Sequence, residues 1–201
     1  MSDMSIEKAH HLTPKQEAQH TDNLKFAMWL YLASEVVIFT TLIAVFVVFR
    51  VNNPERVDEV HKASGLLLVS INTFMLLTSS WTMVMGLRAI QKNDSQGLAR
   101  WISITAILGT LFVMLQFVEY STLSREGITL YGDIFGMRFY APTAFHGAHV
   151  VAGVLWAIYV VNNALSGKYS NNKYLGVEIF GLFWHFVDVV WIVLFTVIYL
   201  V

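Results

Sequence analysis

Five long apolar segments dominate the sequence and restrict the folds that are open to it. They cover residues 26–49, 64–90, 101–123, 139–161 and 177–201. Each segment is close to the roughly 20 residues that an α-helix needs to cross about 30 Å of hydrocarbon. Backbone polar groups in lipid must pair within their own segment, so each segment is expected to be helical. The prediction is therefore an all-α integral membrane bundle of five transmembrane helices at residues 26–201, preceded by a polar tail at residues 1–25.

Composition and charge agree with a protein whose solvent is lipid. The chain is 56% hydrophobic and only 13% charged. Its net charge of -1 provides no basic surface for nucleic acid. Because the chain has no cysteine, disulfide scaffolds and thiolate metal sites are excluded. The larger share of Lys and Arg lies on the side of the N-terminal tail, which predicts a cytoplasmic N-terminus and an outside C-terminus.

Polar side chains inside the predicted spans are the candidate functional residues. A charged side chain at the centre of a bilayer costs about 2.5 to 3.5 kcal/mol, so each one needs a partner or a purpose. These residues are Glu35, Gln116, Glu119, His146, His149, His185 and Asp188. Several are three residues apart and so share a helix face, which predicts inward stripes that bind neighbouring helices or a lipid headgroup. Glu119 is a possible partner of the two histidines near residue 147, where Gly147 and Gly153 are expected to allow close helix packing.

The spacing alone leaves three interpretations of these residues open. They can be hydrogen-bonding groups between helices, which is the most common use of polar residues in membrane bundles. They can form a metal or haem site, although the sequence contains no Glu-x-x-His motif of the kind that bundle metal sites use. They can also form a proton or ion path, with Glu35 near the middle of the first span. The last two would make the chain an independent membrane metalloenzyme or an ion carrier.

Several motifs resemble one family. "FHGAHVVAG" at 145–153 and "WHFVDVVWIVLFTVIYL" at 184–200 resemble the last two helices of subunit III of the haem–copper respiratory oxidases. "SEVVIFT" at 34–40, "NTFMLLTSS" at 72–80 and "LQFVEY" at 115–120 are similar to the preceding helices, in the same order. The longer members of that family have two more spans at the N-terminus. This chain therefore resembles the short bacterial form, which implies a bacterial plasma membrane.

The resemblance implies an accessory role within a larger complex. Subunit I of such an oxidase holds the haem and copper that reduce dioxygen to water, so no cofactor is expected in this chain. In that family, subunit III packs against subunit I and other oxidase subunits, supports proton uptake and binds phospholipid in a cleft. A respiratory supercomplex is a further expected partner. By the same resemblance, Glu35 is the family's buried helix carboxylate, and His146, His149, His185 and Asp188 are its inward polar set.

Histidines in the N-terminal tail form a separate candidate group. Imidazole changes charge near neutral pH, so a cluster of histidines on the cytoplasmic side can collect protons for an uptake path. The residues concerned are His10, His11 and His20. A solvated tail without such a role is the simpler interpretation of the same residues.

Overall fold

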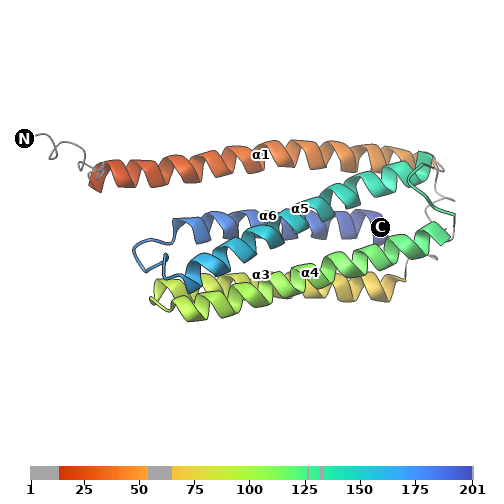
Figure 1. Ribbon diagram of the computed structural model, residues 1–201. Coiled ribbons are helices and arrows are strands. Elements are labelled where there is room, and N and C mark those ends of the chain that lie inside the picture. The colour runs from red at the N-terminus through yellow and green to blue at the C-terminus, as the bar shows by residue number, and fades with distance from the viewer. Residues whose placement is uncertain (1–13, 54–64, 126, 132–133, 201) are drawn as a thin grey trace, which may run out of the picture.

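The computed structural model describes residues 14–53, 65–125, 127–131 and 134–200 of the chain. The described residues form five long α-helices and a final π-helical turn (Figure 1). They are α1 (Pro14–Asn52), α3 (Leu66–Gln91), α4 (Ser95–Arg125), α5 (Ile134–Leu165), α6 (Leu175–Phe195) and η1 (Thr196–Leu200). All five α-helices are part of segments long and apolar enough to cross a membrane, with α6 and η1 forming one segment. The predicted all-α bundle with five spans is confirmed.

Helix α6 occupies the middle of the bundle. It packs against α3, α5 and α1, whereas α3 pairs most extensively with α4. Figure 1 shows α1 along one edge of the bundle and the α3 and α4 pair along the other, with α6 between them. A short turn joins α3 to α4, in which Asn93 takes a left-handed conformation with a φ of 62°. Asp94 then caps α4, because its Oδ1 accepts a hydrogen bond of 2.7 Å from the Gly97 amide.

Trp184 and Trp191 of α6 are the largest fully buried side chains among the described residues, and the Trp184 indole contacts three other helices. It is fully buried and lies against two glycines, Gly109 of α4 and Gly153 of α5. A Cβ atom added to either glycine would lie 2.6 Å from an indole carbon. The indole N–H donates a hydrogen bond of 3.0 Å to the Ser79 hydroxyl of α3. One residue of α6 therefore holds α3, α4 and α5 together.

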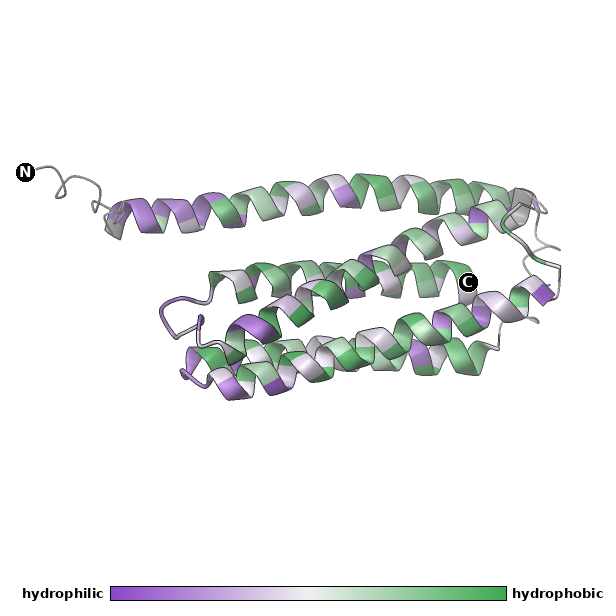
Figure 2. Ribbon diagram, viewed as in Figure 1, coloured by the Kyte–Doolittle hydropathy of each residue, from purple (hydrophilic) through white to green (hydrophobic). Residues whose placement is uncertain are grey.

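Helix α1 is longer than a membrane span. Its 39 residues extend over roughly 58 Å at 1.5 Å per residue, about twice the thickness of the hydrocarbon. Figure 2 shows that its first turns are hydrophilic and the remainder mostly hydrophobic. The polar tail expected up to residue 25 is therefore helical from Pro14 onwards. Proline suits the first turn of a helix, and Glu17 favours its positive end, which explains a helix start that hydropathy does not reveal.

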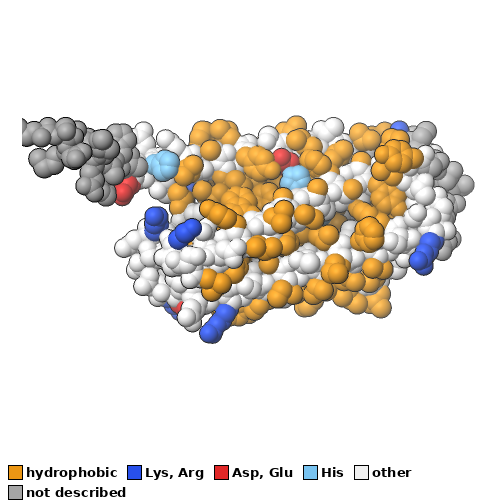
Figure 3. Space-filling model, in the orientation of Figure 1, with side chains coloured by type: hydrophobic (Ala, Val, Ile, Leu, Met, Phe, Trp, Pro, Cys, Tyr) orange, Lys and Arg blue, Asp and Glu red, His pale blue; other side chains and the backbone are white. Residues whose placement is uncertain are grey.

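The surface has the distribution expected of a membrane protein. Figure 3 shows Lys and Arg side chains towards the two ends of the molecule, with a broad band of hydrophobic side chains between them. Large apolar residues point outward within this band, among them Phe117 at 69% exposure and Leu155 at 63%. Such a continuous apolar surface is stable against acyl chains and would promote aggregation in water. The chain is a multi-pass membrane protein.

Candidate functional site

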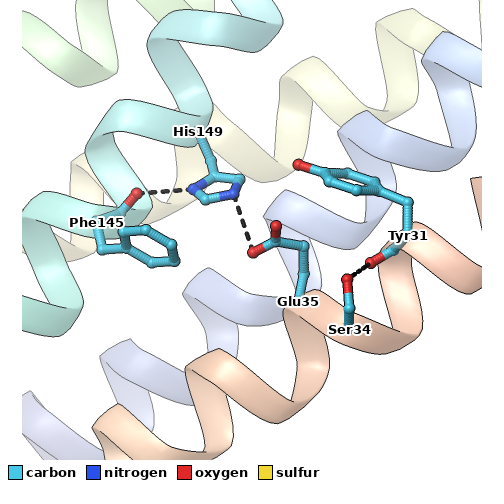
Figure 4. Close-up of polar contacts among 5 residues, drawn as sticks. All are labelled: Tyr31, Ser34, Glu35, Phe145 and His149. Carbon is cyan, nitrogen blue, oxygen red and sulfur yellow. Dashed lines mark hydrogen bonds and ion pairs between the residues drawn. The ribbon is translucent and has the colours of Figure 1, made fainter.

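The structure joins Glu35 of α1 to His149 of α5 near the middle of their helices (Figure 4). His149 Nε2 lies 3.3 Å from Glu35 Oε2, and both side chains are almost completely buried. His149 Nδ1 lies 2.8 Å from the Phe145 carbonyl oxygen. A carbonyl can only accept, so Nδ1 carries a hydrogen. His149 Nε2 and Glu35 Oε2 therefore form a close buried contact, although Oε2 has no hydrogen bond of good geometry among the described residues.

An apolar hollow opens beside this pair. It has a volume of about 460 Å³ and lies among α1, α5 and α6. The lining residues are Met28, Tyr31, Ala148, His149, Ala152, Trp156 and Phe183. Phe39 and Phe145 also pack against the His149 ring, with ring centroids 5.3 Å and 4.7 Å away. The paired imidazole therefore forms part of the wall of an otherwise apolar groove.

The surroundings of His146 differ from those of His149, although the two residues are three positions apart and share a helix face. Its side chain is 1% exposed, and neither ring nitrogen has a hydrogen-bond partner among the described residues. Its ring instead stacks on Trp191 at 5.0 Å and meets the edge of Phe112 at 5.8 Å. The expectation that both imidazoles find polar partners is correct for His149 and wrong for His146. Aromatic packing has taken the place of the expected hydrogen bond.

Glu119 forms the centre of a second buried cluster. Its Oε2 accepts a hydrogen bond of 2.8 Å from Gln116 Nε2, and its Oε1 accepts one of 2.8 Å from the Tyr199 hydroxyl. This links α4 to the π-helical turn at the end of the chain. The suggestion that Glu119 bonds to a histidine of α5 is wrong, because neither ring nitrogen of His146 has a hydrogen-bond partner among the described residues and His149 contacts Glu35 instead. Tyr199 was not predicted, because only the π-helical turn brings its side chain to α4.

His185 and Asp188 face α3, where a row of hydroxyl groups contacts polar side chains of α6. His185 Nδ1 lies 2.6 Å from Ser80 Oγ. The Asp188 carboxyl lies beside the same serine but forms no hydrogen bond of good geometry with the described residues. Trp191 Nε1 donates to Thr73 Oγ1 at 3.0 Å. The α3 hydroxyls were missed from the sequence, although Thr73 and Ser80 are seven residues apart and so share a face.

The two glycines of α5 have different surroundings. Gly153 contacts the Trp184 indole, as expected of a residue that permits close helix packing. Nothing in the described structure lies within 4 Å of a Cβ added to Gly147, so the close packing expected there is wrong for contacts within this chain. The two residues are six positions apart, which places them on different sides of the helix.

The N-terminal end of α1 borders a second, polar hollow. Its volume is about 1190 Å³, and it lies between the first turns of α1 and the connection from α5 to α6. His20 lines it, together with Lys25, which forms an ion pair of 2.8 Å with Glu178. The tyrosine of the connection, Tyr169, is partly buried there, and that burial raises the pKa of its phenol. The predicted tail residues His10 and His11 lie outside the described residues.

The predicted polar residues form several separate contacts. Glu35 of α1 contacts His149 of α5, and His185 of α6 contacts Ser80 of α3. The contact between Gln116 and Glu119 lies within α4. In the part of the chain that the structure describes, no three His, Asp or Glu side chains gather as they would around a metal ion. What the arrangement provides is a set of buried polar contacts, one of which, between Glu35 and His149, lies beside an apolar groove.

Comparison with known proteins gives a consistent family. The family model described as "Cytochrome c oxidase subunit III" matches residues 1–201. Cytochrome c oxidase subunit 3 of Synechocystis sp. is 40% identical over 182 residues, covering 90% of this chain and 77% of that protein. The subunit 3 of Bacillus subtilis is 33% identical over 94% of this chain and 91% of its own length. The cytochrome bo(3) ubiquinol oxidase subunit 3 of Buchnera aphidicola is 33% identical over 86% of this chain and 88% of its own length. The chain belongs to the cytochrome c oxidase subunit III family.

Proposed function

We propose that this chain is the accessory third subunit of a proton-pumping haem–copper oxidase in a bacterial plasma membrane. It packs against subunit I and stabilises it, while the haem and copper that reduce dioxygen are held by the partner. The family match along the whole chain carries this proposal. The relatives include subunits of both cytochrome c oxidases and ubiquinol oxidases, so the same accessory role serves either electron donor.

The groove between α1 and α5 is the proposed site of a structural phospholipid. Along α1, Lys25 lines the polar hollow, and Met28 and Tyr31 line the apolar one. Along α5, Tyr159 lines the polar hollow, and Trp156, about one turn away, lines the apolar one. The two hollows therefore follow each other along one groove, polar at the end of the bundle and apolar towards its middle. This is the polarity of a phospholipid, with its headgroup near the lysine and an acyl chain reaching towards Glu35 and His149.

Support for proton uptake is the third part of the proposed role. With a cytoplasmic N-terminus, the exposed first turns of α1 and the polar hollow lie on the side from which the oxidase takes up protons. His20 is exposed on this projection and lines the polar hollow. Lys25 and Glu178 add further charged groups at the same level.

Purification through a tag on this chain tests the proposal. We expect a gently extracted preparation to contain a larger haem-bearing chain, to show a Soret band and to retain phospholipid detectable by mass spectrometry of the intact complex. The stripped chain should carry no stoichiometric haem or copper. A chain that purifies without partners and transports ions or catalyses a reaction alone would instead favour the independent carrier or metalloenzyme.

Reporter fusions test the orientation. A reporter that is active only outside the cytoplasm is expected to work when fused after Leu200 and to fail when fused before Pro14, because an odd number of spans places the ends on opposite sides. The larger share of Lys and Arg on the N-terminal side sets the direction. The reverse pattern of activity would place the polar hollow on the outer side and would contradict its role in proton uptake.

A further inference from the structure

One stripe of α6 remains open between its neighbours α1 and α3. Its residues recur at intervals of three or four and so lie on one side of the helix. They are Glu178, Leu182, His185, Val189 and Ile192. We call these residues the α6 stripe. Val189 is 58% exposed and Ile192 is 42% exposed, so the α6 stripe reaches the surface in the second half of the helix.

Contacts on both sides fix where the α6 stripe faces. On one side, His185 meets Ser80 of α3 at 2.6 Å. On the other, Phe186 packs against Phe39 of α1 with ring centroids 6.2 Å apart. Helices α4 and α5 contact the opposite side of α6, through the buried Trp184. The α6 stripe therefore forms the floor of a trough with α1 and α3 as its walls.

His185 makes this trough unsuited to lipid. It lies about ten residues from the start of α6, or roughly 15 Å into the membrane, which is close to the midplane. It is half-buried, and its Nε2 has no hydrogen-bond partner among the described residues. Acyl chains offer no donor or acceptor, and a polar group left unpaired in hydrocarbon costs several kcal/mol. Only another protein segment supplies a partner at that depth.

We infer that the α6 stripe docks a transmembrane helix of the haem-bearing subunit, and that this helix presents a hydrogen-bonding group to His185 Nε2. The rest of the stripe at this depth is formed by Leu182, Val189 and Ile192, which suit the apolar face of such a helix. The inference rests on the proposed function for the identity of the partner. The geometry of the trough and the unpaired nitrogen supply the location and the chemistry.

Photo-crosslinking in the assembled oxidase tests the location. A benzophenone amino acid replaces Val189 in one variant and Met114 in a matched control, which is 61% exposed on α4. We expect the Val189 position to crosslink to the haem-bearing subunit and the Met114 position to label phospholipid. Labelling of phospholipid alone from Val189 would overturn the inference. If the haem-bearing chain copurifies but crosslinks only through Met114, this inference fails and the proposed function stands; if no such chain copurifies, the proposed function itself fails.

Substitution of His185 tests the chemistry in the same complex. His185→Leu is expected to increase dissociation of the chain from the detergent-solubilised oxidase about tenfold, the effect of losing one buried hydrogen bond. His185→Gln keeps a side-chain donor and acceptor and should restore most of the association. Because His185 also bonds to Ser80, Ser80→Ala serves as the control for that internal contact. Equal dissociation of Ser80→Ala and His185→Leu would show that the partner subunit offers His185 no hydrogen bond.

Discussion

The Trp184→Ala variant is expected to lose about 3 to 5 kcal/mol of folding free energy. The indole is fully buried between Gly109 and Gly153, and its N–H bonds to Ser79. Its removal leaves a cavity where three helices meet α6, and van der Waals packing of this kind is a main source of helix association in membranes. The measurement is the temperature at which the chain becomes sensitive to protease within the purified oxidase.

Matched variants separate the parts of this effect. Trp184→Phe loses the hydrogen bond to Ser79 and the outer indole atoms that contact the two glycines, but keeps an aromatic ring, so it should cost less than the alanine variant, about 2 kcal/mol. Gly153→Ala places a Cβ against the rigid indole and should destabilise by about 1 to 3 kcal/mol, whereas Gly147→Ala meets open space and should be neutral or stabilising. Equal stability of the two glycine variants would contradict the packing of Trp184 against α5.

The sequence predicted the spans well because a bilayer imposes their length. A run of about 20 apolar residues is sufficient to identify a membrane helix whatever its neighbours are. The start of α1 was not predicted, because its first turns are polar and a hydropathy window reads them as a tail. Helical structure there depends on local signals such as Pro14 and Glu17, which are weaker than apolar length.

Partners of the polar residues were much harder to predict than the residues themselves. Glu35 and His149 were both recognised, but their pairing depends on how α1 and α5 are placed in space. Gly147 and Gly153 look equivalent in the sequence, yet only Gly153 faces a bulky side chain. His146 was expected to need a polar partner and instead stacks on Trp191. Helical spacing identifies which residues share a face, whereas the element that the face meets is decided by tertiary packing.

Loss of one partner from the Glu35 and His149 pair is expected to be more harmful than loss of both. The Nε2 and Oε2 atoms lie 3.3 Å apart beside an apolar groove, so each side chain supplies the other with a polar neighbour. His149→Leu leaves a buried carboxyl without its partner, and Glu35→Leu leaves an imidazole in the same position. Each single variant should cost about 3 kcal/mol, while the double variant should recover a large part of that loss.

Glu35→Gln provides the sharpest control for this pair. Its amide keeps a polar side chain of the same length facing Nε2 and removes only the carboxyl group, so we expect it to cost less than about 1.5 kcal/mol. All four variants are compared by the heat-induced loss of this chain from the purified oxidase, as a double-mutant cycle. If the effects of the two single variants were additive, the two residues would not stabilise one another. The contact between Glu35 and His149 would then not be what holds α1 against α5. Coupling between the two single variants, together with a tolerated Glu35→Gln, would instead show that α1 is held to α5 by a polar contact that does not require a carboxyl at position 35.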